Sequence, residues 1–113
     1  MIEAVFYTNT AGRIWSFQIH GHAGYANAGE PDIVCAAVSA LSLNTVKGLE
    51  KFSEDAFSYE MDPDGFLSAA VEAVRAGKGS SQTDLILNLL LLGLQSVSES
   101  YSEHVTVKVC KRT

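Results

Sequence analysis

The stretch from His20 to Ala40, HGHAGYANAGEPDIVCAAVSA, contains a strand end, a loop and a helix start. The loop consists mainly of small residues and has Gly24 and Gly29 near its two ends, a composition typical of a surface lid. Asp32 stands directly before an apolar run, in the position of a helix N-cap. This one connection therefore gathers two imidazoles, a carboxylate, a thiol and a hydroxyl.

The helix that starts at Asp32 is predicted to extend to about Ser53, because its apolar residues recur with a helical period. Cys35 then lies in the first turn, where unpaired backbone N–H groups and the helix dipole favour a thiolate. Ser39 lies one turn later on the same face. The N–H groups of Val34 and Cys35 are candidates for an oxyanion hole.

The rest of the chain predicts five strands and a second helix. In the second strand, Trp15, Phe17 and Ile19 are expected on one face because apolar and polar residues alternate. The fourth strand is rich in alanine, so a helix is the alternative there. The order β-β-α-β-β-α-β predicts an α+β fold, a mixed or antiparallel β-sheet with two packed α-helices, in a single domain over 1–113. The predicted strands cover 2–8, 14–21, 56–62, 66–74 and 105–110, and the second helix covers about 81–101.

Charge, cysteine content and hydropathy indicate which partners and which compartment suit this chain. The net charge is −5 and the eight Lys and Arg residues do not cluster, which argues against direct nucleic acid binding. The two cysteines, Cys35 and Cys110, and the lack of a signal peptide predict reduced thiols and a cytoplasmic protein. The apolar run 85–94 is too short to span a bilayer, so no membrane association is expected. Its leucines lie on more than one helix face, which predicts a subunit interface in a homodimer.

Three segments together resemble a known family. Gly21-His22-Ala23, the run from Asp32 to Ala40, and the run from Leu92 to Tyr101 are similar to the ribosomal-processing cysteine protease family, also called Prp or YsxB-like. The resemblance implies a small cytoplasmic bacterial endopeptidase without a cofactor. It also implies that the substrate is the precursor of ribosomal protein L-twenty-seven, whose N-terminal extension is removed after an aromatic residue. The loop here is one residue longer than is usual in that family, and Pro31 precedes Asp32.

The resemblance assigns a catalytic dyad to His22 and Cys35, with Cys35 as nucleophile and His22 as general base and acid. Asp32 is expected to cap the helix first and to orient His22 second. Ser39 is expected either to bond in the pocket or to donate to the Cys35 carbonyl within the helix. We predict that Gly24, Tyr25 and Gly29 belong to a substrate-binding loop that is mobile until a peptide orders it, since nothing in it promises much burial.

Other readings of the same residues compete with the dyad. The alanine-rich segment around Cys35 is also typical of a buried cysteine with no chemical role. His20, two residues before His22, is a second candidate for the general base. A zinc site made of His20, His22, Cys35 and His104 is chemically conceivable, although no metal-binding spacing supports it, and we expect no metal. A ribosome-associated binding module without catalysis is the alternative function. Such a module should tolerate Cys35→Ser and should not react with iodoacetamide at pH 6.

Overall fold

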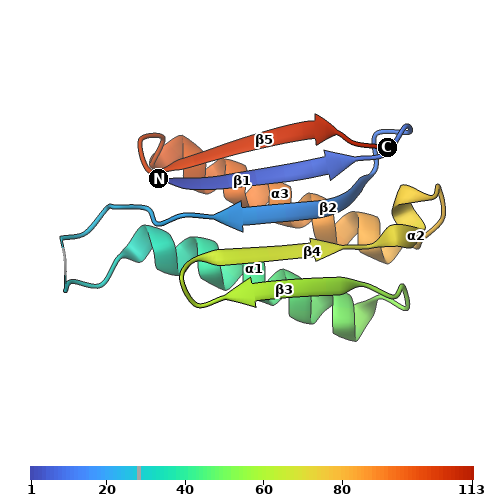
Figure 1. The fold of residues 1–113 in the computed structure, drawn as a ribbon, viewed down its shortest axis with the longest axis horizontal. Helices are drawn as coiled ribbons and strands as arrows, with labels where there is room; N and C mark the ends of the chain where they lie inside the picture. Colours follow the sequence, from blue (N-terminus) through green and yellow to red (C-terminus); the bar gives the residue numbers. More distant parts are fainter. Residues whose placement is uncertain (28) are drawn as a thin grey trace.

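The computed structural model describes residues 1–27 and 29–113. Its strands form one five-stranded sheet, and its two long helices have 20 residues each (Figure 1). The elements in chain order are β1 (Ile2–Thr8), β2 (Ile14–His20), α1 (Ile33–Phe52), β3 (Ser58–Asp62), β4 (Phe66–Ala70), α2 (Glu72–Arg75), α3 (Ser81–Ser100) and β5 (Val105–Lys111).

The sheet is mixed, with the strand order β3-β4-β2-β1-β5. Two antiparallel hairpins, β1–β2 and β3–β4, lie side by side through an antiparallel β2–β4 pair. The last strand returns after α3 and pairs parallel to β1, with Ile2 opposite Val105. The predicted α+β class is therefore confirmed. At one end of the molecule, the end of β2, the start of α1 and the β3–β4 turn lie close together (Figure 1).

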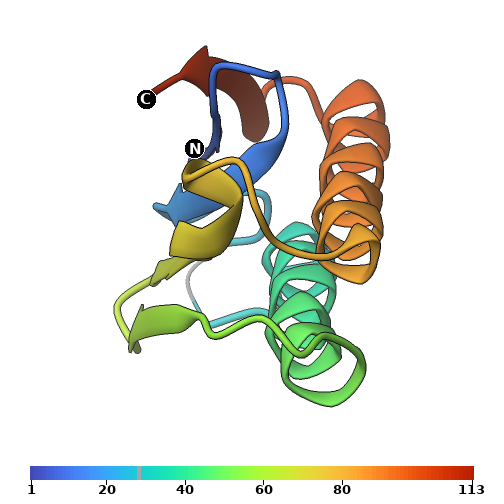
Figure 2. The ribbon, with the colours of Figure 1, turned by 90° about the vertical axis from the view of Figure 1, so that its right-hand side faces the viewer.

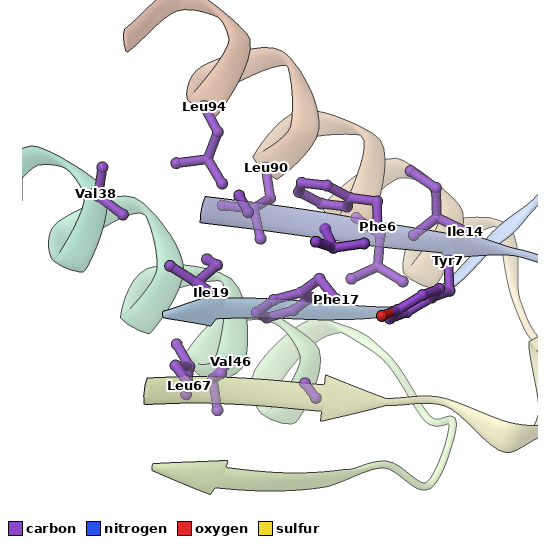
Figure 3. Packing of buried hydrophobic residues seen from close by; sticks show 14 of the residues in the cluster. Phe6, Tyr7, Ile14, Phe17, Ile19, Val38, Val46, Leu67, Leu90 and Leu94 are labelled. Atoms are coloured by element: carbon purple, nitrogen blue, oxygen red, sulfur yellow. The ribbon is translucent and has the colours of Figure 1, made fainter. Parts of the chain in front are cut away.

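Both long helices cover the same face of the sheet (Figure 2). Buried side chains of β1, β2 and β4 meet those of α1 and α3 in one apolar cluster, in which the rings of Phe6 and Phe17 lie 6.0 Å apart (Figure 3). Although α1 is long and apolar enough to cross a membrane, its residues Val34, Val38 and Leu49 are buried against this core. One side of α1 is therefore part of the core of this fold.

The predicted fourth strand is too long. It ends at Ala70, and the short helix α2 follows, which the sequence analysis predicted only as an alternative. The N–H of Val71 donates to the Trp15 carbonyl at 2.7 Å, and Val71 and Val74 are both buried. The chain therefore turns into the core at this point, where a longer strand would expose Val74.

Trp15 does not share a face with Phe17, contrary to the alternation in the sequence. A register shift between Tyr7 and Thr8 places an extra residue in β2. The Trp15 ring instead lies 6.4 Å from that of Tyr7, which points away from the core side occupied by Phe6. The Arg75 guanidinium stacks 4.6 Å from the Trp15 ring centroid and covers it.

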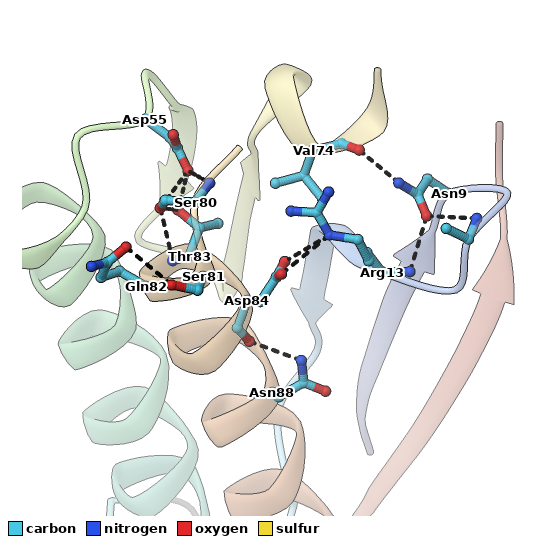
Figure 4. Close-up of polar contacts among 11 residues, drawn as sticks. Asn9, Arg13, Asp55, Val74, Ser80, Ser81, Gln82, Thr83, Asp84 and Asn88 are labelled. Atoms are coloured by element: carbon cyan, nitrogen blue, oxygen red, sulfur yellow. Dashed lines mark hydrogen bonds and ion pairs between the residues drawn. The ribbon is translucent and has the colours of Figure 1, made fainter. Parts of the chain in front are cut away.

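A polar cluster joins the end of α1 to the start of α3 (Figure 4). One oxygen of Asp55 accepts hydrogen bonds from the Ser80 amide, the Ser80 hydroxyl and the Thr83 hydroxyl. The Thr83 hydroxyl bond, followed by that of the Ser80 amide, lowers the pKa of Asp55. On the neighbouring side of α3, Arg13 forms an ion pair with Asp84 at 3.1 Å. These contacts hold the start of α3 against the end of α1 and the β1–β2 turn.

Candidate active site

Three of the predicted site residues line one cavity of about 270 Å³. Cys35 and Ser39 project from the first turns of α1, and His22 comes from the loop that follows β2. The cavity walls are largely apolar and include Val38, Leu43, Phe66 and Leu67. A thiol, an imidazole and a hydroxyl thus line one largely apolar pocket, an arrangement suited to nucleophilic attack on a bound peptide.

Asp32 caps α1, as predicted from the sequence. One carboxylate oxygen accepts from the amides of Val34 and Cys35, both at 3.0 Å, and the other accepts from Tyr25 at 3.0 Å and Ala26 at 3.4 Å. The Cys35 amide is the main cause that lowers the pKa of Asp32, so this group carries negative charge. Asp32 therefore ties the loop to the helix start.

Two secondary expectations for this region are wrong. The amides of Val34 and Cys35 donate to Asp32, so they are not free to form an oxyanion hole. The Asp32 carboxylate also takes its bonds from backbone amides, and it makes no bond to the His22 ring within residues 1–27 and 29–113. Both oxygens of Asp32 already accept backbone hydrogen bonds, so any group that orients His22 must be another one.

Ala23 is the residue through which the loop meets the thiol. Its amide donates to the Cys35 Sγ at 3.2 Å, and the residue is 2% exposed. Gly21, two residues earlier, has φ +96°, and a Cβ there would collide with the Met1 carbonyl oxygen. The chain can therefore leave β2 in this direction only with glycine at position 21. That turn places His22 and Ala23 on the Cys35 side of the strand.

The His22 ring rests on the turn between β3 and β4. Gly65 has φ +100°, and a Cβ there would lie 3.1 Å from His22 Cε1, 3.3 Å from Nε2 and 3.0 Å from the Gly21 carbonyl oxygen. The Gly21 amide donates to the Gly65 carbonyl at 3.0 Å. The bare α-carbon of Gly65 thus forms the surface on which the imidazole lies.

The first half of the predicted lid is anchored in the structure. The Tyr25 ring makes edge-to-face contacts with Tyr101 and His104, each at 5.3 Å between centroids. Tyr25 therefore packs against two rings although it remains 46% exposed, so it buries only part of its surface, in line with the expectation that little of the loop is buried. Gly24 and Gly29 have positive φ, as suits pivots. Ala28, also in this loop, lies outside the described residues.

His20 is placed away from the cavity. It pairs in the sheet with Glu3, and its Nε2 lies 3.6 Å from a Glu3 carboxylate oxygen. Alternation along β2 puts His20 on the face opposite Ile19, which faces the core. His20 therefore neither reaches Cys35 as a base nor joins His22, Cys35 and His104 around a metal ion. In the described ranges, no cluster of three or more such ligands is assembled.

Ser39 lines the cavity, as predicted. The type of bond considered as its alternative, from a side-chain hydroxyl to the carbonyl one turn earlier in the helix, is made instead by Ser42 and Thr45. Sequence reasoning missed that Gly65 lies against His22 and that His104 Nδ1 lies 2.9 Å from the Ala23 carbonyl oxygen. The turn Asp62-Pro63-Asp64-Gly65 was recognisable, but nothing local relates it to His22. The only sequence signal at His104 was its imidazole, which was considered solely as a metal ligand.

Comparison with known proteins decides the family. The model of a family described as cysteine protease Prp matches residues 1–106. The chain belongs to this family. The ribosomal processing cysteine protease Prp of Staphylococcus aureus strain Mu50 is 30% identical over 108 residues, which is 93% of this chain and 95% of the relative. As a member of the Prp family, the chain is a cysteine peptidase that acts on peptide bonds.

Solved Prp-like structures share the fold. Protein SMU.848 of Streptococcus mutans superposes with a TM-score of 0.82 at 33% identity, over 99% of this chain and 96% of that one. The S. aureus Prp crystal structure with a covalently linked product peptide has a TM-score of 0.86 at 24% identity, over 96% and 99%. The mixed sheet with helices on one face is thus the architecture of Prp structures.

Proposed function

We propose that this chain is a cysteine endopeptidase of the cytoplasm that removes the N-terminal extension of the ribosomal protein L-twenty-seven precursor. The observation that carries the proposal is that His22 and Cys35, from separate elements, line one apolar cavity. The S. aureus relative is a ribosomal processing cysteine protease, which supports the choice of a ribosomal protein as substrate. Residues 1–113 are proposed to act as one peptidase domain that needs no cofactor or metal and binds no nucleic acid.

In the proposed reaction, His22 takes the Cys35 thiol proton and the sulfur attacks the scissile carbonyl carbon. The tetrahedral adduct collapses when the C–N bond breaks and His22 returns the proton to the leaving amine. This step leaves a thioester on Cys35. Water then attacks the thioester carbonyl, gives its proton to His22 and releases the acid product with the thiol restored. Ser39 lies one turn from the sulfur, where its hydroxyl can hydrogen-bond the bound peptide.

The cavity favours an apolar residue on the substrate. Val38, Leu43, Phe66 and Leu67 supply an apolar surface for one large side chain, which agrees with an aromatic residue before the cut. Asp62 adds a carboxylate at the same cavity, and the chain carries a net charge of −5. Both features favour a basic peptide over an acidic one.

The direct test is cleavage of the full precursor of ribosomal protein L-twenty-seven from the same genome, read by mass spectrometry. Wild type should release the extension by a single cut, and Cys35→Ala and His22→Ala should each lose at least about 1,000-fold in kcat/KM. His20→Asn is the matched control and should retain wild-type activity. Cleavage by Cys35→Ala, or no cleavage by wild type, would favour the binding module.

The loop that contains Gly24, Tyr25 and Gly29 is proposed to contact the peptide and to tighten on it. The amides of Ala23, Tyr25 and Ala26 already donate hydrogen bonds, so they should exchange slowly with solvent in the free protein. The Gly29 amide should slow only when an uncleaved peptide is bound to Cys35→Ala. Equal protection of Gly29 with and without peptide would remove the lid from the mechanism.

The chain is also proposed to form a homodimer through α3. Leu85, Leu89 and Leu92 lie along one side of this helix and are 71%, 63% and 60% exposed. Three large apolar side chains in a stripe on a small protein are typical of a covered surface. A second copy is the proposed partner, because an identical stripe can pair with itself about a two-fold axis.

A further inference from the structure

The backbone of Ala23 is held at both its N–H and its carbonyl. Its N–H donates to the Cys35 sulfur at 3.2 Å, and its carbonyl oxygen lies 2.9 Å from His104 Nδ1. Because a carbonyl oxygen can only accept a hydrogen bond, Nδ1 of His104 must carry the proton in this contact. A chain of two hydrogen bonds therefore connects the start of β5 to the nucleophile, across 81 positions of sequence.

The Ala23 amide is placed to donate a hydrogen bond to the Cys35 thiolate. The two amides expected to serve the site, those of Val34 and Cys35, already donate to Asp32. Ala23 is the backbone amide that donates to Sγ among the residues the structure describes. An N–H directed at a sulfur stabilises its anion over its neutral form, because hydrogen bonds to charged groups are the stronger ones.

His104 is itself rigidly placed. Its carbonyl accepts from the Ile2 amide at 2.8 Å and its amide donates to the Tyr101 carbonyl at 2.9 Å, so both backbone groups are fixed where β5 joins the sheet. The Tyr25 ring packs edge-on against the imidazole. The side chain is only partly exposed. Such a pre-set donor can fix the Ala23–Gly24 peptide group, and with it the position of Ala23, without rearranging during the reaction.

We propose that His104 is a positioning residue for the peptidase reaction: it holds the backbone of Ala23 at its carbonyl, so that the N–H of the same residue points at the Cys35 sulfur and stabilises the thiolate. The same contact sets the backbone that carries His22, one residue earlier in the chain. This inference rests on the proposed role of Cys35 as nucleophile. The titratable side chains around the thiol include His22 and Asp62, which line its cavity, and Asp32, which caps its helix.

The test compares three variants with wild type. His104→Phe keeps a ring against Tyr25 but removes the donor, whereas His104→Asn keeps an N–H close to the place of Nδ1. His20→Asn removes a histidine from the opposite face of the sheet and serves as the control. The first readout is the rate of Cys35 alkylation by iodoacetamide between pH 5 and 9 in a Cys110→Ser background, which needs no peptidase activity. The second is kcat/KM on the precursor substrate.

His104→Phe should move the alkylation midpoint upward by about one pH unit and lower kcat/KM about tenfold, because the Ala23 N–H is then no longer held toward the sulfur. His104→Asn and His20→Asn should stay within about threefold of wild type. An unchanged midpoint in a folded His104→Phe, or equal losses in Phe and Asn variants, would overturn the positioning role. If His104→Phe does not fold, His104→Gln, whose amide cannot reach the place of Nδ1, replaces it with the same expectation. A midpoint shift without cleavage by wild type would reject the proposed substrate and keep the positioning role.

Discussion

Gly65→Ala tests whether the turn between β3 and β4 forms part of the active site. The added methyl group would lie 3.1 Å from His22 Cε1 and 3.0 Å from the Gly21 carbonyl oxygen. Contacts this short force the neighbours to move by a few tenths of an ångström. The backbone at φ +100° is also unfavourable for any residue with a Cβ. The substitution therefore strains the turn and displaces the imidazole at the same time.

The two effects have different sizes. Strain at positive φ costs about 1–2 kcal/mol, which lowers Tm by roughly 4–10 °C in a chain of this length. A displacement of a fraction of an ångström is expected to cost about tenfold in kcat/KM, since a shift of about 1 Å costs about a hundredfold. The loss of activity should therefore exceed what a small unfolded fraction at 25 °C could explain.

Gly12→Ala is the matched control. Gly12 also has a positive φ, +80°, but a Cβ there would meet nothing within 4 Å. Its turn joins the end of β1 to the start of β2, whereas His22 follows the end of β2. Both variants are compared by thermal unfolding and by kcat/KM at 25 °C. Similar losses in Tm with a loss of activity only in Gly65→Ala would support the reasoning. Equal activity in the two folded variants would refute it, because the Gly65 contact would then have no bearing on His22.

Three further results are expected. Leu89→Lys should convert a dimer into a monomer in sedimentation equilibrium at micromolar concentration, and a wild type that is monomeric throughout would contradict the interface on α3. In single-cysteine variants, Cys35 should be alkylated faster than Cys110 at pH 6 to 7, whereas the reverse order would reject Cys35 as nucleophile. Asp55→Ala should lose more stability in urea at pH 7 than at pH 3, because the folded pKa of Asp55 lies below its ordinary 3.8. The contribution of the carboxylate, up to about 1 kcal/mol after solvent screening, is fully present above the unfolded pKa and is lost as pH falls through the folded pKa. An equal loss at both pH values would show that the Asp55 charge is irrelevant.

The sequence alone determined most of the secondary structure and the order of the site residues. Strand alternation and helical period predicted β1 from Ile2 to Thr8 and helices that start near Asp32 and Ser81, as observed. Asp32 was identifiable as a cap because its partners, Val34 and Cys35, are two and three residues away. These signals are local: they depend on residues within a few positions of one another.

Only the tertiary structure decided which distant groups serve the site. Gly65 reaches His22 because the two hairpins pair through β2 and β4, and His104 reaches Ala23 because β5 returns parallel to β1. The same pairing of strands shifted Trp15 to the outer face through an added residue in β2. No periodicity or capping pattern encodes such contacts, since they depend on the register between segments far apart in the chain. The chemistry was therefore readable from HGHAG and DIVCAAVSA, whereas its positioning was set by the sheet.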